Sequence, residues 1–452
     1  MYRWIVIVFL FAASASAQRY RMLVPCRLQG VEREALCGTL AVRENRTKHE
    51  SPTINLRVVV LPASGKAEGD PMFVLAGGGP GISAVDEAAG VAQAWANVLA
   101  VRDVVLVDQR GTGQSNPLDC SLGNGVTAVK GFFAGEIPAD IVLACRDTLA
   151  KRSDLAAYTT FESAADLDEV RRWLKAKRIN LYGASYTSRV AMVYAQTHPS
   201  HVRTITMKAP MPFSVRNPLT QPADAQRALD KLFRDSAAAF PTLADDFHAV
   251  WERLGTDPPT IDFRGEPLVL TRDVVAGTLR RALMTADGQR TIPATIEAMK
   301  RGDFSFAANT AKIAGAIDQF LNLGMFLSVT CTEDVAWYSK EEARDFARDT
   351  FSGSRMAETM KDLCNHWPAA ALPRDFAKRN VVPVPALIIR GALDPGTSPA
   401  AVRDMARAFE HPLVVEVANM AHTGSSSCVA SMIATFVDGG DLKKIDTKCA
   451  RP

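Results

Sequence analysis

The sequence predicts an α/β fold in which helices flank a largely parallel sheet. Two continuous apolar runs, Met72 to Ala76 and Asp103 to Asp108, resemble strands buried on both faces of a parallel sheet. Further along the chain, short apolar strands alternate with amphipathic helices, and three strand ends carry Ser185, Asp394 and His422. Because such alternation implies right-handed crossovers, the sheet is expected to be mostly parallel.

The first 17 residues have the pattern of a signal peptide. Arg3 precedes an apolar run from Trp4 to Ala13, and Ala15-Ser16-Ala17 has the small-x-small spacing of a cleavage site. The run is too short to span a bilayer comfortably, and no stop-transfer segment follows it. We therefore expect residues 1–17 to be removed and the mature chain to be periplasmic or secreted, without a stable membrane anchor.

Residues 18–211 are expected to form the first part of the α/β core. Residues 37–44 and 53–63 alternate apolar and polar side chains, as half-buried antiparallel strands do. The elements expected after the two buried strands are a helix over 163–177, a strand over 179–182, a helix that ends near His198 and a strand over 202–207. Ser163 and Asp166 have the spacing of a capping box at the start of the first of these helices.

The character of the chain changes at about residue 212, where buried strands give way to amphipathic helices. We expect residues 212–380 to form a helical cap inserted in the second half of the core. The α/β pattern resumes with residues 386–395 and 413–422, and a last amphipathic helix follows. Residues 381–452 are therefore expected to complete the sheet.

Composition and charge exclude several classes of function. The chain has 452 residues, of which 47% are hydrophobic, so a large core can form. Its net charge of +3 is small, and no run of Lys and Arg suggests a nucleic-acid partner. No His, Cys and Asp cluster has the spacing of metal ligands, and no phosphate-binding motif is present, so we expect neither a metal nor a cofactor.

Cysteine usage agrees with export. An even number of cysteines without a C-x-x-C motif favours disulfides in an exported chain. The connectivity cannot be deduced from the sequence, but pairing of successive cysteines closes four short loops, each stabilising by ~2–4 kcal/mol. All eight lie after the expected cleavage point: Cys26, Cys37, Cys120, Cys145, Cys331, Cys364, Cys428 and Cys449.

The three residues at strand ends have the order Ser…Asp…His, which is the order of an α/β-hydrolase triad. Open α/β sheets build their sites at the carboxyl ends of strands. Ser185 would attack a carbonyl, His422 would move the proton to the leaving group, and Asp394 would orient the imidazole. Each residue alone has a structural alternative, such as a turn residue for Asp394, but their shared context favours the triad.

An acyl-transfer site also needs donors for the oxyanion. The Gly-rich loop from Leu75 to Gly81 follows the first buried strand, so the expected donors are the amide of Tyr186 and that of Gly78 or Gly79. The turn around the serine departs from G-x-S-x-G, because Thr187 stands where the last Gly is usual. A threonine fits there only if neighbouring side chains are small.

Five motifs together resemble the proline iminopeptidase and tripeptidyl aminopeptidase group of α/β-hydrolase serine peptidases: GGGPG, DQRGTGQS, GASYT, GALDPGTSP and MAHTGSSSC. TCTEDVAW and CNHWP also resemble the exported tripeptidyl aminopeptidase branch, and the resemblance covers nearly the whole mature chain. Gly77 stands where the group has a histidine. The resemblance implies an exopeptidase for short peptides with a free N-terminus. Their ammonium needs an acidic partner, and Glu333, beside Asp334, matches the family's acidic position.

Two other functions stay open at this point. The same triad serves a carboxylesterase or amidase, since the fold does not fix the substrate. Loss of the Glu333 charge would weaken cleavage beside a free amine and would spare a small ester. The second alternative is a catalytically silent binding protein, and Thr187 is its only support.

Overall fold

The computed structural model describes residues 20–65, 67, 69–75, 78–122, 125–314, 321–378 and 380–451. The expected signal peptide at residues 1–17 and Gly77 lie outside the described residues. Within these ranges, no helix combines the length and the apolar character needed to cross a membrane.

A nine-stranded mixed sheet forms the centre of the core. Side by side, its strands are β1 (Val24–Cys26), β2 (Ala35–Arg43), β3 (Thr53–Leu61), β5 (Val104–Val107), β4 (Met72–Val74), β6 (Ile179–Ala184), β7 (Val202–Lys208), β10 (Ala386–Gly391) and β11 (Pro412–Val417). Strands β1, β2, β3 and β5 pair antiparallel, and every pair from β5 to β11 is parallel. The predicted α/β class is confirmed, and the short edge strand β1 is an addition to it.

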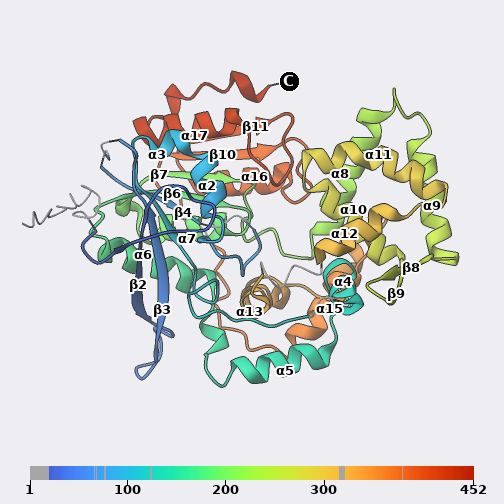
Figure 1. Ribbon diagram of the computed structural model, residues 1–452, viewed down its shortest axis with the longest axis horizontal. Coiled ribbons are helices and arrows are strands. Elements are labelled where there is room, and N and C mark those ends of the chain that lie inside the picture. Colours follow the sequence, from blue (N-terminus) through green and yellow to red (C-terminus); the bar gives the residue numbers. More distant parts are fainter. Residues whose placement is uncertain are drawn as a thin grey trace, which may run out of the picture.

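Helices lie on both faces of the sheet (Figure 1), and alternate residues of the strands pack against the two layers. In β3, Val58 and Val60 belong to one apolar cluster, whereas Val59 and Leu61 belong to the other. The first face is covered by α6 (Thr160–Trp173), α7 (Thr187–Thr197) and α16 (Pro399–Ala406). The second face is covered by α2 (Ala88–Ala94), α3 (Ala96–Leu99) and α17 (Ser427–Gly439). The sheet is therefore buried on both faces, as its continuous apolar runs indicated.

Helix α6 begins before the predicted capping box. Its N-cap is Thr159, whose hydroxyl oxygen accepts the N–H of Glu162 at 3.2 Å. The carboxylate of Asp166 instead accepts two hydrogen bonds, each 2.7 Å long, from the buried guanidinium of Arg110. The capping box at Ser163 is therefore wrong, because Asp166 neutralises a buried cation that follows β5.

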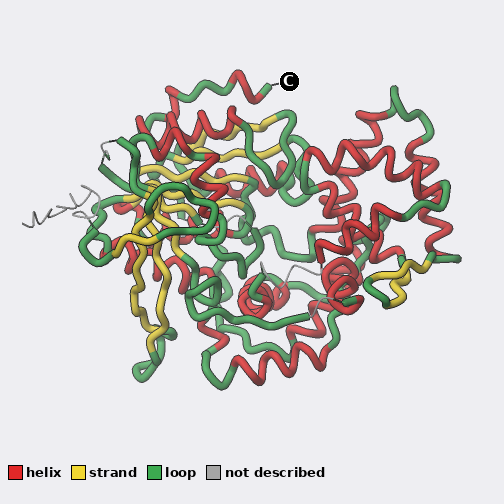
Figure 2. The backbone as a smooth tube through the Cα atoms, viewed as in Figure 1, coloured by secondary structure: helices red, strands yellow, loops and turns green. Residues whose placement is uncertain are grey.

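A second group of helices lies beside the core (Figures 1 and 2). One apolar cluster unites α4 (Val126–Ala134), α8 (Gln221–Ser236), α9 (Leu243–Thr256), α10 (Arg272–Leu283), α11 (Ala286–Lys300), α12 (Ser305–Ala314) and the hairpin of β8 (Thr260–Phe263) and β9 (Glu266–Val269). The main cluster instead takes up α5 (Ala139–Leu149), α13 (Leu323–Glu333), α14 (Lys340–Phe346) and α15 (Arg355–Cys364). The insertion expected at residues 212–380 therefore divides between two clusters, and α4 joins its first part because Val129 and Phe133 pack there.

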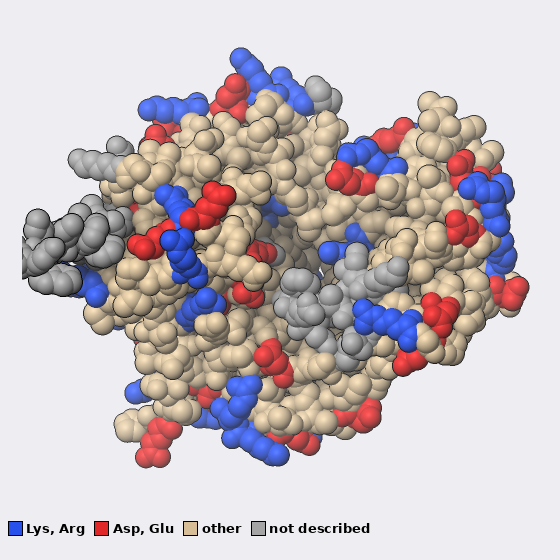
Figure 3. Space-filling view, viewed as in Figure 1, with Lys and Arg blue, Asp and Glu red and all other residues tan. Residues whose placement is uncertain are grey.

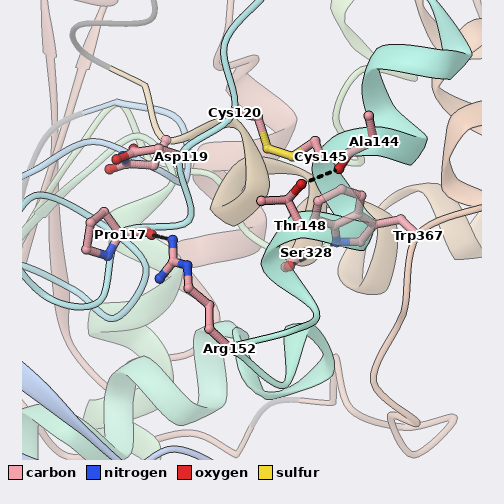
Figure 4. The surroundings of a disulfide bond; sticks show 10 residues. Pro117, Asp119, Cys120, Ala144, Cys145, Thr148, Arg152, Ser328 and Trp367 are labelled. Carbon is pink, nitrogen blue, oxygen red and sulfur yellow. Dashed lines mark hydrogen bonds between the residues drawn. A yellow bond between two sulfur atoms is a disulfide. The ribbon is translucent and has the colours of Figure 1, made fainter.

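Four disulfides connect successive cysteines: Cys26–Cys37, Cys120–Cys145, Cys331–Cys364 and Cys428–Cys449. Figure 4 shows the second of them, which ties the segment after β5 to α5. Near it, Arg152 Nη2 donates to the carbonyl oxygen of Pro117 at 2.6 Å. Disulfides on this scale are typical of proteins that work outside the reducing cytoplasm.

Candidate active site

Ser185 lies on a sharp turn between β6 and α7. Its φ of 53° is in the left-handed region, as in the strained turn that raises a nucleophile above an α/β sheet. The turn requires Gly183, because a Cβ there would lie 2.5 Å from the carbonyl oxygen of Thr187. The N–H of Ser185 donates to the carbonyl oxygen of Lys208 at 2.9 Å, which fixes the turn to β7.

Thr187 is accommodated in this turn by hydrogen bonds. Its side chain is buried, and its Oγ1 accepts the N–H of Ala184 and donates to the carbonyl oxygen of Ala184, both at 2.9 Å. The hydroxyl thus satisfies backbone groups within the turn. The side chain that was expected to crowd the turn is bonded into it, which removes the support that Thr187 gave to a silent binding protein.

Ser185, Asp394 and His422 meet beyond the carboxyl ends of β6, β10 and β11. His422 Nε2 lies 2.9 Å from Ser185 Oγ, and His422 Nδ1 lies 2.8 Å from Asp394 Oδ1. All three side chains are buried. This geometry lets the imidazole take the hydroxyl proton on one side while a carboxylate orients it on the other.

Backbone amides hold Asp394 in place. Its Oδ1 accepts the N–H of Gly396 at 2.7 Å and that of Thr397 at 3.0 Å, besides the bond to His422. Burial by itself would raise the pKa of Asp394, but the charge of His422 and these hydrogen bonds hold it below its usual value. An ionised Asp394 favours the tautomer in which Nδ1 carries the proton, so that Nε2 is free to accept one.

The loop that carries His422 is held between the core and the second group of helices. Lys208 Nζ donates to the carbonyl oxygen of His422 at 3.0 Å. The N–H and the hydroxyl of Thr423 donate to the carbonyl oxygen of Met284, at 3.0 and 3.1 Å. On the neighbouring loop, Arg227 Nη2 donates to the Asp394 carbonyl oxygen at 3.1 Å. These supports could not be predicted from the sequence, because each depends on a contact between distant segments.

The expected oxyanion donors lie beside the serine. Gly78 forms a parallel bridge with Ser185, and Gly79 and Tyr186 line the same cavity as Ser185. The amide of Tyr186 stands at the start of α7, where unpaired N–H groups and the helix dipole favour negative charge. Ser185 is thus flanked by backbone from both predicted segments. Their role as donors stays a prediction.

A cavity of about 280 Å³ opens at Ser185 and His422. Figure 3 shows the surface hollowed between the core and the second group of helices. The wall is mostly apolar, with Phe132, Phe133, Met211, Val215 and Met284. Its charged side chains are Arg189, Arg280, Arg281 and Asp334. The volume is at the small end for ligand sites, so it suits a short substrate. Among the described residues, no three His, Cys, Asp or Glu side chains gather as metal ligands.

Glu333 does not line this cavity, although the sequence placed both acids in the substrate site. Its two carboxylate oxygens accept the N–H and the hydroxyl of Thr160, each at 2.6 Å. Burial raises the pKa of Glu333 to about 6. Asp334, which follows the end of α13, does line the cavity.

Arg189 is a buried cation between these two acids. Its Nη1 lies 3.5 Å from Glu333 Oε2, and its Nη2 lies 3.1 Å from Asp334 Oδ1. With both carboxylates ionised, the three side chains sum to one negative charge. Arg189 lies one turn after Ser185 in a stretch of α7 that is buried from Thr187 to Ala195, so an arginine among buried positions was the signal that could have revealed it.

Comparison with known proteins finds two family models along the chain. One, described as alpha/beta hydrolase fold, matches residues 71–265, and one described as TAP-like protein matches residues 349–449. The matched ranges contain the three residues that meet at the cavity.

Three curated relatives show how varied the similar proteins are. The chain is 24% identical to serine protease Hip1 of Mycobacterium tuberculosis (strain H37Rv), over 94% of this chain and 90% of that protein. It is 26% identical to carboxylesterase B of the same organism, over 92% and 87%. It is 29% identical to tripeptidyl aminopeptidase of Streptomyces lividans, over 43% of this chain and 38% of that protein.

Proposed function

We propose that this chain, which belongs to the α/β hydrolase family and carries a TAP-like C-terminal region, is an exported serine aminopeptidase for short peptides. It would release N-terminal residues or tripeptides. The proposal is carried by one observation, which is that two buried acids, Glu333 and Asp334, share Arg189 beside the cavity of Ser185 and His422.

The proposed mechanism proceeds through an acyl-enzyme. Ser185 Oγ attacks the substrate carbonyl while His422 Nε2 takes its proton, and the amides of Tyr186 and Gly79 stabilise the oxyanion. The C–N bond then breaks, and His422 returns the proton to the departing amine. A water molecule attacks the ester in the second half, with His422 as its base, and the peptide acid leaves as Ser185 regains its proton. Asp394 stabilises the imidazolium in both halves.

The acidic cluster supports recognition of a free N-terminus. With both acids ionised, the cluster carries one negative charge that Arg189 does not balance. Burial raises the pKa of both acids, to about 6 for Glu333, so this charge develops as the pH rises. Asp334 is the member on the cavity wall, so a substrate ammonium can reach it. Glu333 would contribute without contacting the substrate. Because Glu333 also pairs with Arg189, Arg189 neutralises the charge of Asp334 less completely.

A carboxylesterase or amidase is the second candidate. The observation that favours it is the ion pair between Asp334 and Arg189, because the acid that would bind an ammonium already has a cationic partner. The hydrogen-bonded arrangement of Ser185, His422 and Asp394 argues against a silent binding protein, which has no need of it.

Asp334→Asn separates the two hydrolase functions. It changes the cluster charge from −1 to 0, so kcat/KM for an alanyl or tripeptidyl anilide with a free N-terminus is expected to fall about 10- to 100-fold. Hydrolysis of p-nitrophenyl acetate, which lacks an amine, should stay within about threefold of the wild type. Equal turnover of free and N-acetylated anilides by the wild type would contradict the aminopeptidase and favour the esterase or amidase.

A further inference from the structure

Arg280 is a cation on the cavity wall that has no carboxylate partner among the described residues. It lies near the end of α10 and lines the same cavity as Ser185. Its Nη1 donates to Gln221 Oε1 at 2.8 Å, and the part of the chain that the structure describes provides it with no ion pair. A guanidinium has five N–H donors, so most of them are available to a ligand.

Burial makes this arrangement costly without an anion. Burial lowers the pKa of Arg280 to about 10, and no acid among the described residues offsets the loss of solvent. Buried or half-buried charges in proteins are usually paired. Arg281 lines the cavity next to Arg280, which adds a second positive charge to this wall.

The end of α10, which carries Arg280, lies next to the loop that carries His422. Met284 follows Arg280 by four residues, which is about one helical turn on the same face of α10. The carbonyl oxygen of Met284 accepts the N–H of Thr423, the residue after His422, at 3.0 Å. The imidazole delivers its proton to the leaving group, so this wall faces the departing part of a substrate.

A row of polar side chains connects Arg280 with the acidic cluster. Gln221, which accepts from Arg280, donates in turn to the side-chain oxygen of Asn217. The backbone N–H of Asn217 bonds the carboxylate of Asp334. One small cavity therefore has an acid, Asp334, and a cation without a carboxylate partner among the described residues, Arg280. A short peptide with both termini free carries the complementary pair of charges.

We infer that Arg280 binds a carboxylate of the substrate, so that the enzyme prefers short peptides whose free C-terminus lies close to the scissile bond. The choice of a peptide rests on the proposed function, whereas the carboxylate site itself does not. A carboxylate on the acyl side of an ester would satisfy the same guanidinium.

The first arm of the test compares trialanine and tetra-alanine as free acids and as C-terminal amides. Wild type is expected to cleave the acids with a kcat/KM about 10- to 100-fold above that of the amides. Arg280→Met should abolish this preference by slowing the acids alone, and Arg280→Lys, which keeps the charge, should retain part of it. Arg290→Met is the matched control, because Arg290 is exposed on the neighbouring helix α11 and lies outside the cavity.

The second arm uses p-nitrophenyl esters, which report on Arg280 even if no peptide is cleaved. It compares the monoester of succinic acid with the neutral butyrate ester. If Arg280→Met lowers kcat/KM for the succinate ester alone, Arg280 binds a carboxylate on the acyl side of the substrate. If wild type cleaves the peptide acids with a higher kcat/KM than the amides and Arg280→Met does not, Arg280 binds the C-terminal carboxylate. If Arg280→Met changes kcat/KM equally for the peptide acids and their amides, and equally for the succinate and butyrate esters, the inference is wrong.

Discussion

Asp394→Ala is expected to lower kcat by about 10⁴-fold, which is the usual scale for loss of the carboxylate in a serine triad. The variant leaves His422 without its partner at Nδ1 and leaves the imidazolium without a counter-charge. The measurement is the steady-state hydrolysis of a chromogenic ester at pH 8. Its control is the urea midpoint of each variant, which separates lost catalysis from lost folding.

Asp394→Asn should lower kcat much less than Asp394→Ala does in this protein. The amides of Gly396 and Thr397 donate to Oδ1, the same oxygen that bonds His422. They should orient the Asn carbonyl toward His422, so the tautomer is kept and only the charge is lost. The expected loss is about 10- to 100-fold. Equal decreases of kcat in the Asn and Ala variants would contradict this role of the two backbone amides. A decrease of kcat below about tenfold in Asp394→Ala would contradict the triad.

Arg189→Met is expected to destabilise the fold by about 3–5 kcal/mol at pH 8, because it removes the cation that bonds the buried carboxylates of both Glu333 and Asp334. The measurement is the free energy of unfolding in urea. At this pH Glu333 is ionised, since its pKa is about 6. This result would show that Arg189, which lines the cavity, stabilises Glu333 and Asp334 in their charged form.

Arg344→Met provides the matched control for this experiment. Arg344 also bonds two carboxylates, Glu341 at 2.9 Å and Glu358 at 2.8 Å, but its side chain is 51% exposed. Exposed ion pairs contribute little to stability, so the free energy of unfolding is expected to change by less than about 1 kcal/mol. If the two arginine variants lose equal stability, burial does not distinguish these clusters, and our account of Arg189 fails.

The sheet could be predicted because its central strands are buried on both faces. That burial requires continuous apolar runs such as Met72 to Val74, and such runs are visible in a sequence. The approach of Ser185, Asp394 and His422 followed from the same pattern, since residues just beyond parallel strands share one edge of the sheet.

Contacts between helices were harder to predict. The apolar sequence of α4 predicts burial but does not name its partner, so its packing against α10 was missed. Glu333 and Asp334 illustrate the limit for a site. Helix α13 ends at Glu333, and a step of one residue turns a side chain by about 100°, so only the second acid reaches the cavity.

Labelling with a fluorophosphonate measures directly whether Ser185 is an activated nucleophile. Folded, disulfide-intact protein is expected to take up one equivalent of the probe. Peptide mapping should place the probe on Ser185, and Ser185→Ala should take up none. An absence of labelling in the folded wild type, or labelling that persists unchanged in Ser185→Ala, would contradict the claim that Ser185 is an activated nucleophile.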